Sequence, residues 1–296
     1  MWFKDTTFRL TPHPSCFLES VIKIFLTVRN RLAITKKCIE AICRHTTNPF
    51  QLFVYDNNSN YLVKEHFEYW QRLYEKKVLT QLVVTTEQST FTAFSKAVAS
   101  NLFGQQHELD PNKDKYDFLL MLDNDIILLP KWDEHVKHAW KVLFKTQMNH
   151  IKIITQSPGG VKNKTDKIDL GKGNSGRVGK LGGSGLWCVR PTFFREVGFL
   201  NIGQLVGCDK RHDQLYWPML DKAAQGKSYI LALNQKIGLH CGSIAGSVCN
   251  RLTRLKGDPN KEEKIKFEVQ EDEIEKTSFD DFFQKIMQDP EFAKGW

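Results

Sequence analysis

The sequence Tyr116-Asp-Phe-Leu-Leu-Met-Leu-Asp-Asn-Asp-Ile-Ile-Leu-Leu-Pro-Lys-Trp132 places two carboxylates directly after a continuous apolar run. That run, Phe118 to Leu122, has the length and composition of a strand covered on both faces. Asp123 and Asp125 then lie at the carboxyl end of the strand, the edge of an open α/β sheet where ligands bind. Asp and Asn also form simple turns by bonding to their own backbone, so the motif alone fits either a turn or a site.

Three strand–helix units precede this stretch, and each predicted strand ends in polar residues. The strands are expected at 21–27, 51–55 and 79–85, and the helices at 32–45, 61–76 and 90–102. Such alternation predicts a parallel sheet with helices on both faces, and right-handed crossovers bring the strand ends to one edge. A simple turn could explain any one of these polar segments. Four of them at the same edge of one sheet are better explained by a ligand site. The segments are Thr27–Arg31, Asp56–Ser59, Thr85–Ser89 and Asp123–Asp125.

The second half of the chain is less regular. A helix at 132–146 and a strand at 151–155 lead into residues 157–183, which are rich in glycine and lysine. We expect a long loop there, either solvated and mobile or, in its basic part at 161–180, able to bind an acceptor or phosphate.

After this loop, a glycine turn leads into an aromatic strand near Trp187, and a short helix runs from Pro191 to its cap at Gly198. A further helix is expected at about 214–224, with strands on either side of residue 235. The tail, 250–296, ends in an amphipathic helix at 279–287 and is interpreted as a packing or interaction appendage.

The composition is that of an ordinary globular protein, with 41% hydrophobic and 26% charged residues. Because the N-terminal residues lack the apolar segment of a signal peptide and no run approaches the ~20 apolar residues of a membrane span, we expect a cytoplasmic protein without a transmembrane segment. The seven cysteines contain no CxxC pair, which favours reduced thiols. The net charge of +8 fits a polyanionic acceptor, an anionic membrane or a phosphate-bearing cofactor, and does not by itself indicate nucleic-acid binding.

Taken in order, these motifs resemble those of the inverting glycosyltransferases of family 2, which have the GT-A fold. The resemblance runs from about Val21 to Gly242. It implies an α/β protein with a Rossmann-like, mostly parallel sheet, helices on both faces, a mixed second half and a helical C-terminal tail. The motifs are Thr-Val-Arg-Asn-Arg at 27–31, Val-Tyr-Asp-Asn-Asn-Ser at 54–59, Leu-Asp-Asn-Asp at 122–125, the stretch from Gly182 to Leu200, His-Asp at 212–213 and Leu-His-Cys-Gly at 239–242.

The resemblance also implies domain boundaries. A leader is expected at 1–20 and a glycosyltransferase domain at 21–249, with an appendage at 250–296. Within the domain, 21–125 form the nucleotide-binding half and 126–249 the acceptor half.

The implied reaction moves a sugar, a hexose by analogy, from a nucleotide-sugar to an acceptor hydroxyl, with a UDP-sugar favoured as donor. Negative charge grows on the leaving diphosphate, and a divalent cation held by carboxylates neutralises it. Hard oxygen ligands suit Mn²⁺ or Mg²⁺. By resemblance, Asp125 of this Asp-x-Asp (DXD) motif and His240 are the metal ligands, while Asp123 and Asn124 face the ribose or donor sugar.

The resemblance places the nucleotide against the first two strand ends. Asp56 is expected to bind the base, next to Asn57, while Thr27, Val28 and Arg29 line the base and ribose pocket. An ion pair between Arg29 and Asp56 is the structural alternative.

The acceptor hydroxyl needs a general base, and the family places an Asp at the head of a helix. Asp213 is the expected base and Asp209 the second candidate, while a helix cap is the alternative role for Asp213. The sequence departs from the family pattern at Ser95, where the family has Asn, and at His212, where it has Glu. The donor-sugar and acceptor region is expected at Gly183, Ser184, Gly185, Trp187 and His212.

Two other functions are alternatives to this one. The first is a glycosyltransferase acting on hydroxymethylated DNA bases or another polyanion, for which the net charge and the basic loop would guide binding. The second is a non-catalytic binding module organised by zinc on Cys208, His212, His240 and Cys241. Adjacent His240 and Cys241 fit one tetrahedral ion poorly, which disfavours the zinc module.

Overall fold

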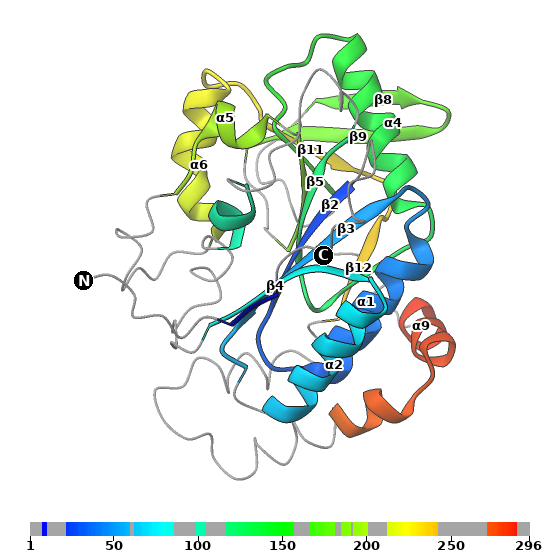
Figure 1. Cartoon of the computed structure of the whole chain (residues 1–296). Helices are drawn as coiled ribbons and strands as arrows, with labels where there is room; N and C mark the ends of the chain where they lie inside the picture. The colour runs from blue at the N-terminus through cyan, green and yellow to red at the C-terminus, as the bar shows by residue number, and fades with distance from the viewer. Residues whose placement is uncertain are drawn as a thin grey trace, which may run out of the picture.

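A mixed sheet of ten strands forms the centre of the protein (Figure 1). The strand order is β1-β4-β3-β2-β5-β10-β7-β11-β9-β8. A separate two-stranded sheet pairs β6 with β12. The computed structural model describes residues 8–10, 22–59, 62–85, 99–104, 117–156, 166–180, 185–190, 192–200, 212–241 and 271–288, with the backbone alone at 8–10 and 212–213.

The predicted parallel half is confirmed. Strands β4, β3, β2 and β5 lie side by side and run in the same direction. The chain between them forms the predicted helices α1 (Leu32–His45) and α2 (Val63–Glu75), and residues 99–104 are helical. The strand bounds are β2 Ile22–Val28, β3 Phe50–Asn57, β4 Leu79–Thr85 and β5 Leu119–Asp123.

Both faces of the sheet are buried, as the continuous apolar strands predict. Successive side chains of a strand point to opposite faces, so Ile24 and Phe25 enter different core clusters. The cluster with Ile24 is covered by α1, α2 and α4 (Trp132–Lys145). The other contains residues of the 99–104 helix, α5 (Phe193–Val197) and α6 (His212–Ala223), and Figure 1 shows α5 and α6 on the side away from α1.

The second half adds strands in both directions. β10 (Leu186–Val189) runs antiparallel to both β5 and β7 (Ile153–Gln156), and β11 (Ile230–Leu233) runs parallel to β7. β6 (Ile126–Leu128) pairs antiparallel with β12 (Gly238–His240), which brings the end of the acidic motif beside His240.

Two segments differ from the sequence prediction. Within the expected leader, β1 (Phe8–Leu10) pairs antiparallel with β4 at the edge of the sheet. The expected long loop is wrong for residues 166–180, where β8 (Lys167–Gly171) and β9 (Asn174–Gly179) form a hairpin that pairs with β11. The alternation of polar and apolar residues in β1 and β8 covers only three or four residues, and β9 lacks it, so the pairing depends on neighbouring strands as well as on local sequence.

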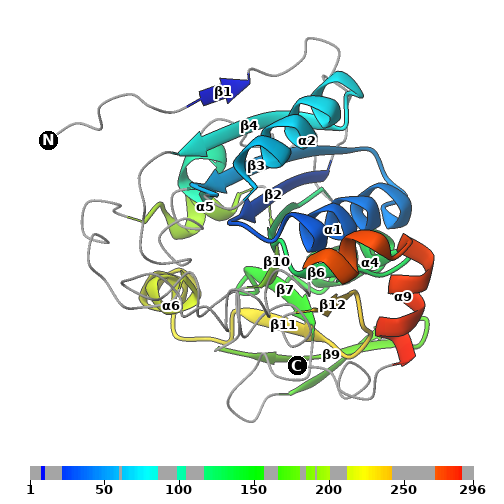
Figure 2. The same cartoon turned by 90° about the horizontal axis from the view of Figure 1, so that it is seen from below.

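The C-terminal segment packs on α1. Residues 271–276 are helical and α9 (Phe279–Gln288) follows, and Figure 2 shows α9 beside α1. Arg44 of α1 donates to Asp280, and the ring of His45 lies 5.7 Å from that of Phe279. No helix among the described residues is long and apolar enough to cross a membrane.

A substitution at Gly176 of β9 can test whether the β8–β9 hairpin packs against β11. A Cβ at this position would lie 2.6 Å from Leu231 Cδ1 and 2.8 Å from the Ala232 carbonyl oxygen. We therefore expect Gly176→Ala to lower the free energy of unfolding by about 1–3 kcal/mol, because overpacking a tight contact is destabilising. Denaturant unfolding measures this effect.

Arg177→Ala is the matched control, because Arg177 is the next residue of β9 and is exposed. Its expected effect is within about 0.5 kcal/mol. A Gly176→Ala protein as stable as the parent would show that the hairpin does not pack on β11.

Candidate active site at the carboxyl edge of the sheet

The predicted polar strand ends meet at one edge of the sheet. Thr27 of β2 pairs in register with Asp123 of β5, and Val28 pairs with Asp56 of β3. The Asp123 amide also donates to the Gly185 carbonyl at 2.9 Å, which places Gly185, directly before β10, beside the acidic motif.

Asp125 lies at this edge between a cation and an imidazole. Its Oδ2 accepts from Arg31 Nη1 at 2.8 Å and lies 3.2 Å from His240 Nε2. The Cys241 amide donates to the Asp125 carbonyl at 2.7 Å, so the β6–β12 pairing fixes the backbone on both sides of the contact. Arg31 is largely buried, whereas 35% of the His240 side chain is exposed.

The Asp125 carboxylate is ionised at neutral pH. Burial alone would raise the pKa of Asp125, but the Arg31 guanidinium and the His240 hydrogen bond outweigh it and hold that pKa well below its usual range. Its second oxygen, Oδ1, is buried and has no hydrogen-bond partner among the described residues. A buried charged oxygen is costly without a partner, so this atom suits an incoming ligand.

These residues fit a divalent cation in part. Mg²⁺ and Mn²⁺ bind through one or two carboxylates together with substrate phosphates, so a complete protein cage is unnecessary. Asp125 and His240 supply one oxygen and one nitrogen donor, while Arg31 adds a competing positive charge. Within the described ranges, no group of three or more His, Cys, Asp or Glu side chains has the arrangement of a metal site.

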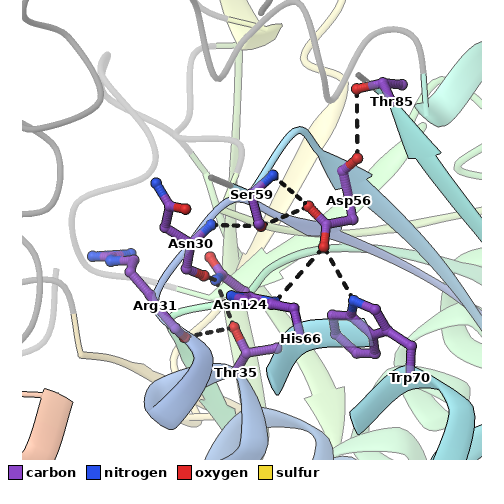
Figure 3. A network of polar contacts seen from close by, with 9 residues as sticks. All are labelled: Asn30, Arg31, Thr35, Asp56, Ser59, His66, Trp70, Thr85 and Asn124. Atoms are coloured by element: carbon purple, nitrogen blue, oxygen red, sulfur yellow. Dashed lines mark hydrogen bonds and ion pairs between the residues drawn. The ribbon is translucent and has the colours of Figure 1, made fainter. Parts of the chain in front are cut away.

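Asp56 is buried and held from inside the protein (Figure 3). Its Oδ1 accepts from the Ser59 hydroxyl at 2.6 Å and from the Ser59 amide at 3.0 Å. Its Oδ2 accepts from Trp70 Nε1 at 3.1 Å and lies 3.7 Å from His66 Nδ1. Burial lowers the pKa of His66, so that ring is neutral at pH 7. The carboxylate is 1% exposed, which suits positioning of the β3–α2 loop, and its contact with a base stays a prediction.

A hydrogen-bonded chain joins the ends of β3, β2 and β5 (Figure 3). The Asn30 amide donates to Ser59 Oγ at 2.8 Å, which links it to the Asp56 loop. Asn124 Nδ2 donates to Thr35 Oγ1 at 2.8 Å, and that hydroxyl donates to the Arg31 carbonyl at 2.8 Å. Asn30 and Arg31 have positive φ angles of 52° and 59°, which these bonds maintain.

The remaining predicted site residues lie in different surroundings. Thr27, Val28 and Asn57 are buried at the edge, whereas Arg29 is partly exposed. Trp187 is fully buried, with its ring 6.0 Å from that of Tyr216, so its side chain packs in the core.

The expected base lies where side chains are not described. Asp213 and His212 begin α6, with the backbone alone described, and Asp209, Gly183 and Ser184 lie outside the described residues. Their roles stay predictions.

The zinc module has little support in the described part of the chain. Cys241 is fully buried, and burial raises the pKa of its thiol well above the usual value. His240 contacts Asp125 instead. Cys208 lies outside the described residues, as does the His212 side chain.

Sequence reasoning placed His240 with Asp125 but missed Arg31 as a partner of Asp125 and Glu271 as a partner of α1. Arg31 is the second arginine of the Thr-Val-Arg-Asn-Arg motif. Its place directly before the predicted helix was the one signal in the sequence that could have indicated a role at the site. Arg31 is also the N-cap residue of α1 and provides no side-chain cap. The cap comes from Glu271, whose Oε2 accepts from the Ala33 amide at 2.9 Å across 238 residues of sequence. No local pattern in the sequence indicates that contact.

No protein-family model matches the chain, and no curated protein matches it. Among solved structures, the mannosyltransferase PcManGT from Pyrobaculum calidifontis, in complex with GDP-Man and Mn²⁺, superposes with a TM-score of 0.51 at 12% identity. That match covers 83% of this chain and 63% of PcManGT. The fold is GT-A-like.

Two other structures match over similar lengths. TarS 1–349 of S. aureus has a TM-score of 0.47 and 14% identity, covering 86% of this chain and 69% of TarS 1–349. GlyE of Streptococcus pneumoniae TIGR4 has a TM-score of 0.45 and 11% identity, covering 90% of this chain and 64% of GlyE. At these identities the comparison concerns the fold, and the site has to be argued from its own residues.

The Glu271 cap makes stability depend on pH. Burial raises the pKa of Glu271 to about 7, against an ordinary 4.5, although the Ala33 amide and Arg31 partly offset this. The folded protein therefore binds more protons than the unfolded chain, and stability falls as pH rises from about 4.5 to about 7. Between these pH values, we expect the free energy of unfolding of Glu271→Gln to fall by up to ~3 kcal/mol less than that of the parent.

Urea unfolding at pH 5, 6 and 8 measures the effect as the difference between parent and variant. Glu275→Gln is the control, because Glu275 lies one helical turn away and is exposed. A parent–variant difference that is the same at every pH would contradict the assigned burial of Glu271.

Proposed function

We propose that the protein is a glycosyltransferase that moves a sugar from a nucleotide-sugar to an acceptor hydroxyl, with inversion, as the resemblance to family 2 implies. The observation that carries the proposal is Asp125 at the carboxyl edge of the sheet, an ionised carboxylate whose buried Oδ1 has no hydrogen-bond partner among the described residues. Ligands of open α/β sheets bind at this edge. The GT-A-like fold supports the same placement.

In this proposal Asp125 and His240 hold Mn²⁺ or Mg²⁺. When bound, the cation neutralises the charge that develops on the leaving diphosphate. Asp123, beside the Gly185 turn, orients the ribose or donor sugar. Asn124 is held by Thr35 and Asn30, so it keeps the motif in place rather than contacting the donor directly.

The nucleotide lies along the ends of β2 and β3 in this arrangement. Buried Asp56 holds Ser59, and Ser59 holds the Asn30 amide, so the loop that faces the nucleotide is ordered before binding. Preorganised groups lower the free-energy cost of ordering on binding. Asp213 at the head of α6 removes the proton of the acceptor hydroxyl, with Asp209 as the second candidate. A UDP-sugar is the favoured donor.

The polyanion-directed alternative depends on the basic segment 161–180. Its described part forms the β8–β9 hairpin, where Lys180 pairs with Asp221. In the sheet order β8 lies five strands from β5. At the usual spacing this is about 24 Å. The hairpin therefore suits contact with a distant part of a large acceptor rather than a lid over Asp125.

A thermal-shift screen against UDP-, GDP-, CMP- and dTDP-sugars with Mn²⁺ tests the proposal. A ligand that binds the folded state raises the unfolding temperature, and we expect one UDP-sugar to raise it by at least about 2 °C. Asp125→Asn should abolish the Mn²⁺-dependent part of the shift. If no nucleotide-sugar shifts the parent protein with or without Mn²⁺, the proposed function is wrong.

Asp213→Asn tests the assignment of the base. We expect donor binding to be unchanged and turnover to fall by about 100-fold or more, because a general base contributes at least that factor. Turnover is measured as release of the nucleoside diphosphate from the donor identified in the screen.

Asp221→Asn is the matched control, since Asp221 lies in the same helix, is exposed and pairs with Lys180. Its turnover should be close to that of the parent. Near-normal turnover of Asp213→Asn would move the base to Asp209.

A further inference from the structure

Arg31 lies at the start of α1, near two carboxylates from distant parts of the chain. Its Nη1 is 2.8 Å from Asp125 Oδ2, and Glu271 Oε2 accepts from the amide of Ala33, two residues beyond Arg31, at 2.9 Å. Burial raises the pKa of Glu271, and the positive charge of Arg31 partly offsets that rise. All three side chains are largely buried. The positive charge of Arg31 therefore lies near two negative charges, that of Asp125 in the acidic motif and that of Glu271 in the C-terminal segment.

The position of Arg31 is fixed by its backbone. The residue has φ 59° and ψ 50° as the N-cap of α1. Its carbonyl accepts from both the amide and the hydroxyl of Thr35, and Thr35 is held by Asn124 of the acidic motif. A left-handed backbone is unfavourable for Arg, so these bonds hold it where its side chain reaches Asp125.

This placement has an electrostatic consequence for any cation that reaches Asp125. A guanidinium beside the carboxylate already neutralises it, and it repels a second positive charge in a region of low dielectric. Glu271 acts in the opposite sense, because its negative charge offsets that of Arg31. The affinity of Asp125 for a cation then depends on the balance between Arg31 and Glu271.

We propose that Arg31 is a built-in counter-ion of Asp125 that weakens divalent-cation binding, and that Glu271 of the C-terminal segment offsets it. This inference rests on the proposed function, in which Asp125 is a cation ligand. Arg31 and Glu271 are positioning residues here, since neither is required to touch the cation. The C-terminal segment thereby sets the affinity of a site that belongs to the sheet.

Mn²⁺ titration of the full chain at pH 8, followed by the electron paramagnetic resonance signal of free Mn²⁺, tests the inference without an activity assay. At this pH Glu271 is ionised, because its pKa is about 7. We expect Arg31→Gln to tighten Mn²⁺ binding about five- to tenfold and Glu271→Gln to weaken it by a similar factor. The opposite signs distinguish charge balance from general structural damage.

Arg44→Gln and Glu275→Gln are the matched controls. Arg44 lies in the same helix as Arg31 and pairs with Glu40 and Asp280, and Glu275 pairs with Lys36. Both side chains are more exposed than their counterparts, and we expect Mn²⁺ affinity within about twofold of the parent, since exposed charges are well screened.

The outcomes separate the inference from the function on which it rests. If the parent binds Mn²⁺ and Arg31→Gln weakens that binding or leaves it unchanged, the inference is overturned and the function stands. If Arg31→Gln does not fold, Glu271→Gln decides alone, and unchanged affinity in that variant overturns the inference. A parent that binds no Mn²⁺, even with a nucleoside diphosphate, overturns both the metal-dependent function and the inference.

Discussion

The buried ion pair between Arg31 and Asp125 is the contact on which the rest of the site depends. Removing two charges from water is costly, and their mutual attraction compensates only when further hydrogen bonds hold the pair. Here the compensation comes from the backbone of Arg31, which Thr35 and Asn124 fix, and from His240 on the second sheet. The pair therefore links the start of α1, which follows β2, to the loop after β5 and to the β6–β12 sheet.

Two aspartates at the same edge have opposite surroundings. Asp56 has both oxygens occupied by Ser59 and Trp70, and it acts as an internal anchor for a loop. Asp125 has one oxygen occupied and one buried without a described partner. A bound ligand needs a carboxylate oxygen that is not already hydrogen-bonded, such as Oδ1 of Asp125. A carboxylate with both oxygens bonded, like that of Asp56, has no acceptor left for a ligand. The geometry thus makes Asp56 of β3 an internal anchor and is consistent with the ligand role proposed for Asp125 after β5.

Regular periodicity made the parallel half predictable. The apolar strands and the amphipathic helices between them carry local signals, and β4 and α1 have the predicted bounds, with β2 shifted by one residue. The hairpin at 166–180 and the strand at 8–10 were missed because their alternating runs are only a few residues long and their pairing depends on strands distant in the sequence. Arg31–Asp125 and Ala33–Glu271 were missed for the same reason, since a residue type does not reveal a partner 94 or 238 positions away.

The cap that Glu271 places on α1 also orders events during synthesis. Domains fold from the N-terminus as the chain emerges, and contacts between distant segments form last because loop closure must precede them. The residues of the parallel half leave the ribosome long before residue 271, and until then the first turn of α1 lacks the hydrogen bond from the Ala33 amide to Glu271. The contact between Glu271 and α1 can therefore form only after residue 271 has emerged, so a shorter chain ending before this residue would contain the acidic motif with the start of α1 uncapped by Glu271.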